Sequence, residues 1–321
     1  MAKEIVIPKS VGEDESSILD LLSMLPWNHD ASAPSVIVDF GRVEFLGQGA
    51  IAALSCWVRK LKGLKVAVEL RNVTTSSAFT YLQRIDFFSS CGLLMEENFT
   101  RHPPRNRFFP LTTIASMEDV ENVSSQIASC IAPEAVDSDD PDQTGLFDLL
   151  TYSISELATN VVQHSRSRGI VCCQHYPSSD KVVVGLADPG IGIRESFRLN
   201  GSPHWSDTMT DLVAIKKSLE YRVSSRTHQT NAWGESINAG VGLTFLKNLV
   251  SVSGGDFYIV SGNTLYGENA GKVSTKSTRY DGTLCIMSFQ RSKVSNFQEM
   301  FNQIKQDLKG AQPDGHEDMF Q

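Results

Sequence analysis

The sequence lacks any long hydrophobic run, and this absence argues against a segment that crosses a membrane. Nowhere do about 18 apolar residues stand together, so no membrane-spanning helix is expected. The opening residues MAKEIVIPKS contain no apolar stretch behind a basic start, so no signal peptide is expected either. We therefore expect a cytoplasmic protein.

Cysteines are few, and none of the 6 stands in a Cys-x-x-Cys pair that would indicate a metal site. Cys172 and Cys173 are adjacent, so in a strand their side chains would point to opposite faces. We expect reduced cysteines that mostly act as small core residues.

Two common phosphate-binding signatures are absent. No Gly-x-Gly-x-x-Gly follows the first strand of a βαβ unit, which excludes a Rossmann site, and no Gly-x-x-x-x-Gly-Lys-Ser/Thr segment indicates a P-loop. The formal net charge is -8, so the chain has no general attraction to phosphate backbones or anionic lipid. Neither nucleic acid nor a membrane is an expected partner.

The first part of the chain alternates short apolar runs with helical periodicity. The pattern predicts strands at 4–8, 36–40 and 65–70 and helices at 16–25, 49–61 and 76–85. Strands that alternate with helices form largely parallel sheets, so the fold class is α/β. The segment RHPPRNRFFP interrupts this pattern, and we place a domain boundary near residues 101–106.

Within the second part, an acidic and solvent-exposed loop is expected at 132–145, where it joins two helices. The apolar pattern then predicts a helix at 146–165, a hairpin of strands at 169–175 and 181–187, a helix at 242–251, and strands at 256–260 and 283–289. A long polar stretch covers 193–239. Residues 294–308 form an amphipathic helix, and the remainder to 321 is expected to be disordered.

Glu156 and Asn160 are one helical turn apart on the helix predicted at 146–165, so their side chains share a face. A carboxylate and an amide so placed could hold Mg²⁺ and its waters, because this ion prefers oxygen ligands. The pair taken alone is more typical of the exposed side of an amphipathic helix.

Three glycine-containing segments follow strands or open helices. Asp188-Pro-Gly190-Ile-Gly192 directly follows the strand at 181–187, where glycine lets the backbone approach a ligand closely. Gly240 and Gly242 stand where a helix begins, and the free N–H groups of a helix N-terminus favour a phosphate. Asp281-Gly282-Thr283 leads into the last strand, and alone it would be a plain hairpin turn.

The order and contexts of these four motifs resemble the GHKL family, the ATP-binding fold shared by gyrase, Hsp90, histidine kinases and MutL. The matching segments are SELATNVVQHS, ADPGIG, NAGVGL and DGT. The resemblance covers roughly residues 107–291 and implies a GHKL (Bergerat) α/β sandwich.

The resemblance implies a role for each polar motif residue. Asp188 would accept a hydrogen bond from the adenine amino group of ATP, and Thr283 would support the adenine. Asn160 would ligate Mg²⁺, and Glu156 would act as general base.

The resemblance also assigns the glycines and the polar stretch. Gly190 and Gly192 would let the chain wrap around the nucleotide, and Gly240 and Gly242 would present N–H groups to the phosphates. Residues 193–239 would form the lid over the triphosphate. Its candidate phosphate contacts are Arg194, Arg198, Arg222, Arg226 and His228.

The first motif continues to His164 as Glu-x-x-x-Asn-x-x-x-His, a form similar to that of bacterial anti-sigma-factor serine kinases. His164 could equally cap the end of its helix. The first part of the chain resembles a STAS domain, the fold of anti-sigma-factor antagonists, through SVIVDFGRVEFLGQGAIAALSCWVRKLKG. Gln48 stands where that family commonly has its phosphorylated serine, so this domain is not an expected target in cis.

The sequence therefore predicts a STAS-like domain at 1–100, a GHKL ATP-binding domain at 101–292, and a C-terminal helix and tail at 293–321. The expected function is Mg-ATP-dependent signalling, through a protein kinase or a conformational switch. An ATP-hydrolysing or nucleotide-gated interaction module without kinase activity is the alternative, and a module with a vestigial site is a third reading. A sigma factor or STAS-type regulator is the expected protein partner, and a second copy in a homodimer is another candidate.

Overall fold

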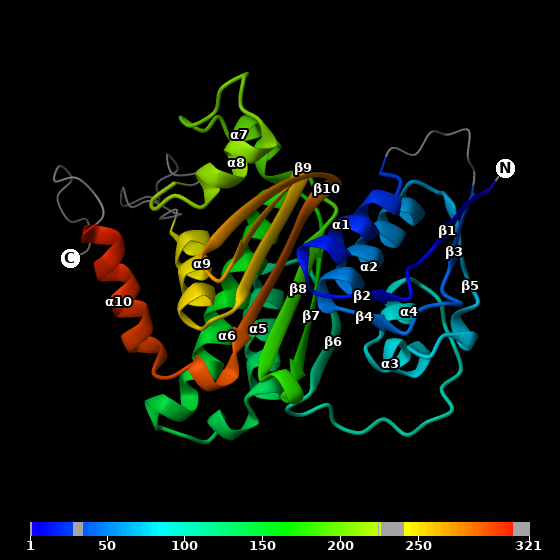
Figure 1. The fold of residues 1–321 in the computed structure, drawn as a ribbon, viewed down its shortest axis with the longest axis horizontal. Helices are drawn as coiled ribbons and strands as arrows, with labels where there is room; N and C mark the ends of the chain where they lie inside the picture. Colours follow the sequence, from blue (N-terminus) through cyan, green and yellow to red (C-terminus); the bar gives the residue numbers. More distant parts are fainter. Residues whose placement is uncertain (1, 28–34, 224, 226–240, 311–321) are drawn as a thin grey trace.

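The computed structural model describes residues 2–27, 35–223, 225 and 241–310, and it has a mixed α/β fold. The α/β expectation is confirmed. Figure 1 shows two units side by side, each built around its own sheet. No helix among the described residues is both long enough and apolar enough to cross a membrane.

The first unit contains a parallel three-stranded sheet in the order β1-β3-β5. Its strands are β1 Lys3–Val6, β3 Ser35–Asp39 and β5 Ala67–Arg71, and a small parallel pair adds β2 Ser10–Val11 and β4 Phe45–Leu46. Its helices are α1 Glu15–Met24, α2 Gln48–Gly63, α3 Phe79–Arg84 and α4 Phe87–Ser90. The parallel core predicted from the alternating pattern is confirmed here.

The second unit contains an antiparallel five-stranded sheet in the order β6-β7-β8-β10-β9. Its strands are β6 Phe108–Ile114, β7 Gly169–Tyr176, β8 Lys181–Asp188, β9 Asp256–Asn269 and β10 Lys272–Gln290. One face is covered by α5 Met117–Ile131, α6 Pro141–Asn160 and α9 Gly242–Val252, and α10 Phe297–Gly310 packs on α6 and α9 (Figure 1). Short 3-10 turns lie at Val73–Thr75, Pro133–Ala135, Pro177–Ser179 and Arg291–Lys293.

Helix α2 of the first unit covers the other face of this sheet. A Cβ at Gly185 in β8 would lie 2.4 Å from the Gln48 carbonyl oxygen, and a Cβ at Gly49 would lie 2.1 Å from Ile286 in β10. The Cys56 thiol donates to the Ala187 carbonyl at 3.2 Å. Since both faces are covered, residues 182–187 of the central strand β8 are all buried and apolar rather than alternating.

The adjacent cysteines confirm this two-sided burial. Cys172 packs in the core between the sheet and the first unit, and Cys173 packs in the core beneath α5 and α6. Their predicted placement on opposite faces of a strand is confirmed. All six cysteines are free thiols, and only Cys130 is not fully buried.

Several boundaries differ from those the sequence predicted. The loop expected at 132–145 ends early, because Asp140 caps α6 and Pro141 occupies its first turn. Strand β6 was not predicted, because its proline resembles a break. Pro110 is tolerated because β6 is an edge strand with an irregularity between Phe109 and Thr112.

The polar stretch at 193–239 is also more ordered than a loop. It contains α7 Gly192–Leu199 and α8 Asp211–Ser218, with a small core of its own around Phe197, Met209 and Ala214. Thr210 caps α8 by accepting from the Val213 N–H. Residues 224 and 226–239 of this stretch, and 311–321 of the predicted tail, lie outside the described residues.

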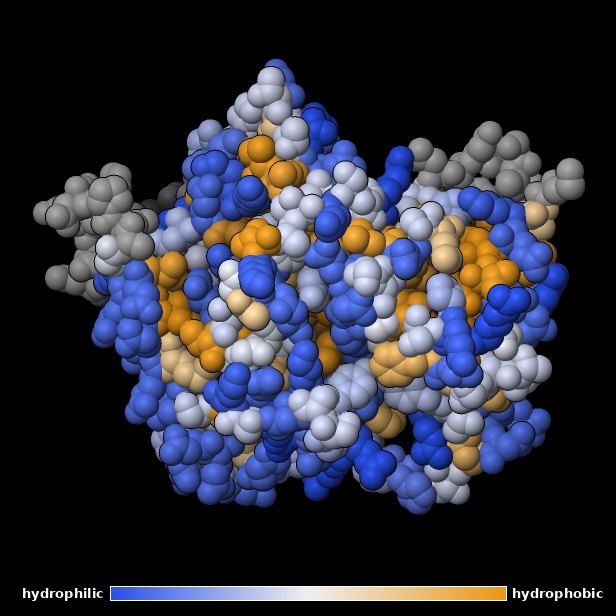
Figure 2. All heavy atoms as spheres, in the orientation of Figure 1, coloured by the Kyte–Doolittle hydropathy of each residue, from blue (hydrophilic) through white to orange (hydrophobic). Residues whose placement is uncertain are grey.

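The face shown in Figure 2 carries mainly hydrophilic residues, with several groups of hydrophobic residues between them, including one over the first unit. Helix α10 is the predicted amphipathic helix. Its Phe301 stacks on Phe245 of α9 with ring centroids 4.5 Å apart and also contacts Tyr152 of α6. The aromatic contacts tie the C-terminal helix to the layer that covers the second sheet.

Candidate functional site

A cavity of about 350 Å³ lies between the second sheet and the helices α6, α7 and α9. This volume is in the range of small-molecule sites, which are usually preformed clefts. The cavity collects residues from all the motifs that the sequence singled out. Those that line it are Glu156, Asn160, Asp188, Gly192, Gly242 and Thr283.

Asp188 is the last residue of β8, and Thr283 of β10 lies directly opposite it in the ladder. The Asp188 side chain accepts from the Gly190 N–H at 2.8 Å and from the backbone and hydroxyl of Thr283. Burial raises its pKa to about 7, while these hydrogen bonds and nearby Lys60 act to lower it. A buried carboxylate with a raised pKa that borders a cavity is a candidate for a functional site.

The backbone around Asp188 depends on glycine. Gly282 adopts a φ of +121°, and a Cβ there would lie 2.0 Å from the Asp188 carbonyl oxygen. Gly192 begins α7 with a φ of +75°. Gly190 does not line this cavity, and packs instead against the Ser165 carbonyl.

The reading of Asp281-Gly282-Thr283 as a plain hairpin turn is wrong. These residues lie inside β10, where the pairing with β9 shifts between Tyr280 and Thr283. The turn that joins the two strands comes at Ala270 and Gly271 instead. The irregular pairing bends this part of β10 toward Asp188. Bulges often redirect a strand in this way next to a functional site.

Glu156 and Asn160 both line the cavity from α6, so they are not simply an exposed polar pair. Burial raises the pKa of Glu156. A Cβ at Gly242, the first residue of α9, would lie 1.9 Å from Oε2 of Glu156. The glycine therefore lets the N-terminus of α9 approach the carboxylate.

The N-terminus of α9 carries no side-chain cap. Its N-cap residue is Val241, whose side chain has no acceptor, so the N-cap side chain satisfies none of the first N–H groups of the helix. Such a terminus attracts an anion through its backbone donors and its dipole. Gly240, the other glycine expected to bind phosphate, lies outside the described residues.

Sequence reasoning missed Gln163, which follows the end of α6. The helix ends at Asn160, and the π-helical turn Val161–Ser165 follows, a feature common at functional sites. Gln163 in this turn lines the cavity, and its Oε1 is buried without a hydrogen-bond partner among the described residues. The buried amide oxygen is therefore an unused acceptor in a residue that borders the cavity.

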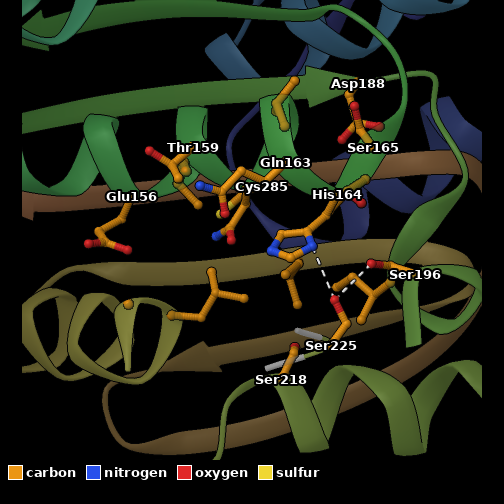
Figure 3. Close-up of a pocket in the computed structure, with 18 of the residues that line it drawn as sticks. Glu156, Thr159, Gln163, His164, Ser165, Asp188, Ser196, Ser218, Ser225 and Cys285 are labelled. Carbon is orange, nitrogen blue, oxygen red and sulfur yellow. Dashed lines mark hydrogen bonds between the residues drawn. The ribbon is translucent and has the colours of Figure 1, made fainter. Parts of the chain in front are cut away.

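His164 contacts the polar stretch after β8 instead of only ending its helix. Its Nδ1 lies 3.1 Å from Oγ of Ser225, which lies 3.0 Å from Oγ of Ser196 in α7 (Figure 3). Asn200 donates to both serines. No sequence signal pointed to either serine, because isolated serines in a polar stretch carry no pattern.

The described cations of the polar stretch do not line the cavity. Arg194 stacks over Trp205, Arg198 pairs with Glu195, and Arg222 lies over Tyr221. Arg226 and His228 lie outside the described residues. Phosphate contacts by the first three would need different side-chain positions.

Gln48 lies far from the mouth of this cavity, behind the sheet. It is fully buried at the start of α2, and its Nε2 donates to the Tyr81 hydroxyl at 2.9 Å. Its backbone packs on Gly185 of β8 from the face that the cavity does not use. Position 48 is therefore neither accessible nor chemically able to accept a phosphoryl group within its own chain.

No family model matches this chain, and no curated protein matches it either. Within the described residues, no group of three or more His, Cys, Asp or Glu side chains could hold a metal by itself. A metal ion at this site would therefore share its ligands with a bound molecule and with water.

Proposed function

We propose that the second unit binds ATP with Mg²⁺ in the manner of the GHKL (Bergerat) proteins. The observation that carries this proposal is the convergence of Asp188 and Thr283, at the end of the sheet, with Glu156 and Asn160, on the facing helix, around one cavity. In the view of Figure 3, Glu156 and Asp188 lie at opposite ends of that cavity. An elongated ligand with a base at one end and phosphates at the other fits such an arrangement.

Asp188 would bind the adenine end. Its carboxylate is 2% exposed and already accepts from Gly190 and Thr283, which fixes its orientation. A carboxylate accepts but cannot donate, so it selects a base with an exocyclic amino group. The apolar floor beside it, formed by Leu186, Ile259 and Cys285, suits a planar ring.

The opposite end would bind the phosphates. The uncapped N-terminus of α9 offers backbone donors next to Glu156. Asn160 would hold Mg²⁺ through its amide oxygen, together with phosphate oxygens and water. The ion would neutralise phosphate charge, which is its usual contribution to phosphoryl chemistry. The unpaired side-chain oxygen of Gln163 would accept a hydrogen bond from the ligand or from a metal-bound water.

Glu156 would orient or deprotonate the group that attacks the terminal phosphate. Burial raises its pKa, which makes it a stronger base than an exposed glutamate. The attacking group would be water in an ATPase or nucleotide-gated switch, and a hydroxyl of a separate protein in a serine or threonine kinase. Buried Gln48 favours the switch, because the first unit presents no acceptor at this position.

The first unit would be STAS-like, and it would act as a docked regulatory part rather than as a substrate. Its parallel sheet and its helix α2 follow the pattern expected from the sequence. The protein partner of this two-unit chain would be a separate sigma factor or STAS-type regulator.

Titration calorimetry and thermal unfolding with Mg-ATP test the proposal. We expect binding and an increase in Tm for the wild type, and no heat and no Tm increase at millimolar ATP would refute it. Incubation with γ-labelled ATP, alone and with candidate partner proteins, separates the functions. Labelled partner supports a kinase, and free phosphate alone supports a switch. Glu156→Ala should keep ATP binding and abolish phosphate release.

A further inference from the structure

Helix α2 places one cation of the first unit behind the adenine end of the proposed site, on the face of the sheet opposite the cavity. Nζ of Lys60 lies 3.1 Å from Oδ2 of Asp281 in β10, and the two side chains are 23% and 29% exposed. The same ammonium lies 5.5 Å from the ring centroid of Trp27. An ion pair that is largely shielded from water and backed by an aromatic ring is better fixed than a surface pair.

Asp281 is joined directly to the residues that hold Asp188. Gly282 follows it and packs on the Asp188 backbone, and Thr283 donates to the Asp188 carboxylate. The pairing of β10 with β9 is irregular here, so the ladder alone does not fix this segment. Arg279 of the same strand also pairs with Asp281, at 3.4 Å and with a more exposed side chain, so the ion pair with Lys60 adds a second and better shielded tether, which comes from the first unit.

From this geometry we propose that Lys60 is a positioning residue through which the first unit completes the adenine end of the nucleotide site. The inference rests on the proposed ATP-binding function. Lys60 holds Asp281 so that Gly282 and Thr283 meet Asp188, without touching the nucleotide itself. The docked first unit and the bound nucleotide are thereby energetically coupled, and each favours the other.

The charges around Asp188 give this inference a second readout. Cys56 and Lys60 of α2 and Tyr280 of β10 lie near Asp188 on the side opposite the cavity, and Asp281 lies next to Tyr280 and pairs with Lys60. Lys60 is the cation in this group, and it lowers the pKa of Asp188 against the effect of burial. Removing its charge should raise that pKa, so that Asp188 takes up its proton at a higher pH.

The chain offers a matched control on the same helix. Arg59 precedes Lys60 and also crosses to the second unit, donating to Oγ1 of Thr113 in β6 at 3.0 Å. Strand β6 is at the far edge of the sheet from β9, away from Asp281. Arg59→Met therefore removes a cation and an inter-unit contact without touching the adenine end.

The experiment measures Mg-ATP affinity from pH 6 to 9 for the full-length wild type, Lys60→Met, Lys60→Arg and Arg59→Met. We expect Lys60→Met to lose about threefold to tenfold in affinity at pH 7. Its affinity should also begin to fall at a higher pH than that of the wild type. Lys60→Arg should recover most of the loss, and Arg59→Met should match the wild type.

Asp281→Asn tests the same ion pair from its other side and serves if Lys60→Met does not fold. It should weaken binding to a similar degree, and the double variant should lose little more than either single variant. Wild-type binding with an unchanged affinity and pH profile in Lys60→Met would overturn this inference alone. Wild type that binds no ATP would overturn the proposed function, and this inference with it.

Discussion

Gly282 lies so close to the backbone of Asp188 that a Cβ at position 282 would be 2.0 Å from the Asp188 carbonyl oxygen. The contact joins β10 to the end of β8, the two segments that carry the adenine end of the proposed site. The backbone of Gly282, with a φ of +121°, is also one that residues with a side chain rarely adopt. Two independent constraints therefore require glycine here.

Gly282→Ala should lower the free energy of unfolding by about 1–3 kcal/mol and abolish ATP binding, because β10 must move away from Asp188. Urea denaturation and calorimetry measure the two effects. Gly201→Ala is the matched control, since Gly201 also has a positive φ but a Cβ there would have no atom within 4 Å. A Gly282→Ala protein that binds ATP like Gly201→Ala would show that the close contact is dispensable.

Asp188 should make ATP binding depend on pH. Burial raises its pKa to about 7, so the accepting carboxylate is lost as the pH falls below that value. We expect the affinity to drop about tenfold for each pH unit below 7. Asp188→Asn should weaken binding roughly 10- to 150-fold at pH 8 and show little of this dependence, which also corrects for protonation of ATP itself.

The same group should affect the stability of the protein without ligand. Its folded-state pKa of about 7 lies above the ordinary value of 3.8, so the folded state holds the proton more tightly than the unfolded state. The resulting stabilisation is fully present below pH 3.8 and is lost as the pH rises through about 7. Urea denaturation of Asp188→Asn should show a smaller decline in unfolding free energy over this interval. An unchanged decline would mean that other groups dominate it.

The close packing of the first unit on the second sheet can also be tested by replacing a glycine at the contact between them. A Cβ at Gly185 would lie 2.4 Å from the backbone oxygen of Gln48, and backbone cannot move aside cheaply. Gly185→Ala should therefore lower the free energy of unfolding by about 1–3 kcal/mol. Gly63→Ala at the end of α2 is the control, because nothing lies within 4 Å of its Cβ position. It should be neutral or stabilising by up to about 1 kcal/mol, and equal effects of both changes would argue against close docking.

Local patterns in the sequence were enough for much of the fold. Apolar periodicity placed α2, α6 and α9 and the hairpin of β7 and β8 within a few residues. Glu156 and Asn160 were brought to one face by helical spacing, and both line the same cavity. Such features depend on residues close in sequence, which periodicity and turn chemistry describe well.

Contacts between distant segments could not be predicted. The packing of Gly185 on Gln48 and the pair of Lys60 with Asp281 depend on how two sheets are arranged in space. Neither Lys60 nor Gln163 stands in a pattern that distinguishes it from an ordinary surface residue. The sequence does not show that the side-chain oxygen of Gln163 lacks a hydrogen-bond partner. That depends on the direction of the side chain, which the π-helical turn sets.

Glu156 and Gly242 allow the phosphate end of the proposed site to be tested by a double-mutant cycle. A Cβ at position 242 would lie 1.9 Å from Oε2 of Glu156, so Gly242→Ala should displace the carboxylate and the start of α9 together. We expect ATP affinity to fall roughly tenfold or more, because backbone donors to the phosphates are lost. Truncation in Glu156→Ala removes the clashing oxygen, so Gly242→Ala should cost clearly less affinity in that background. Calorimetry on the four proteins measures the coupling, and additive losses would show that the two residues do not meet in the working site.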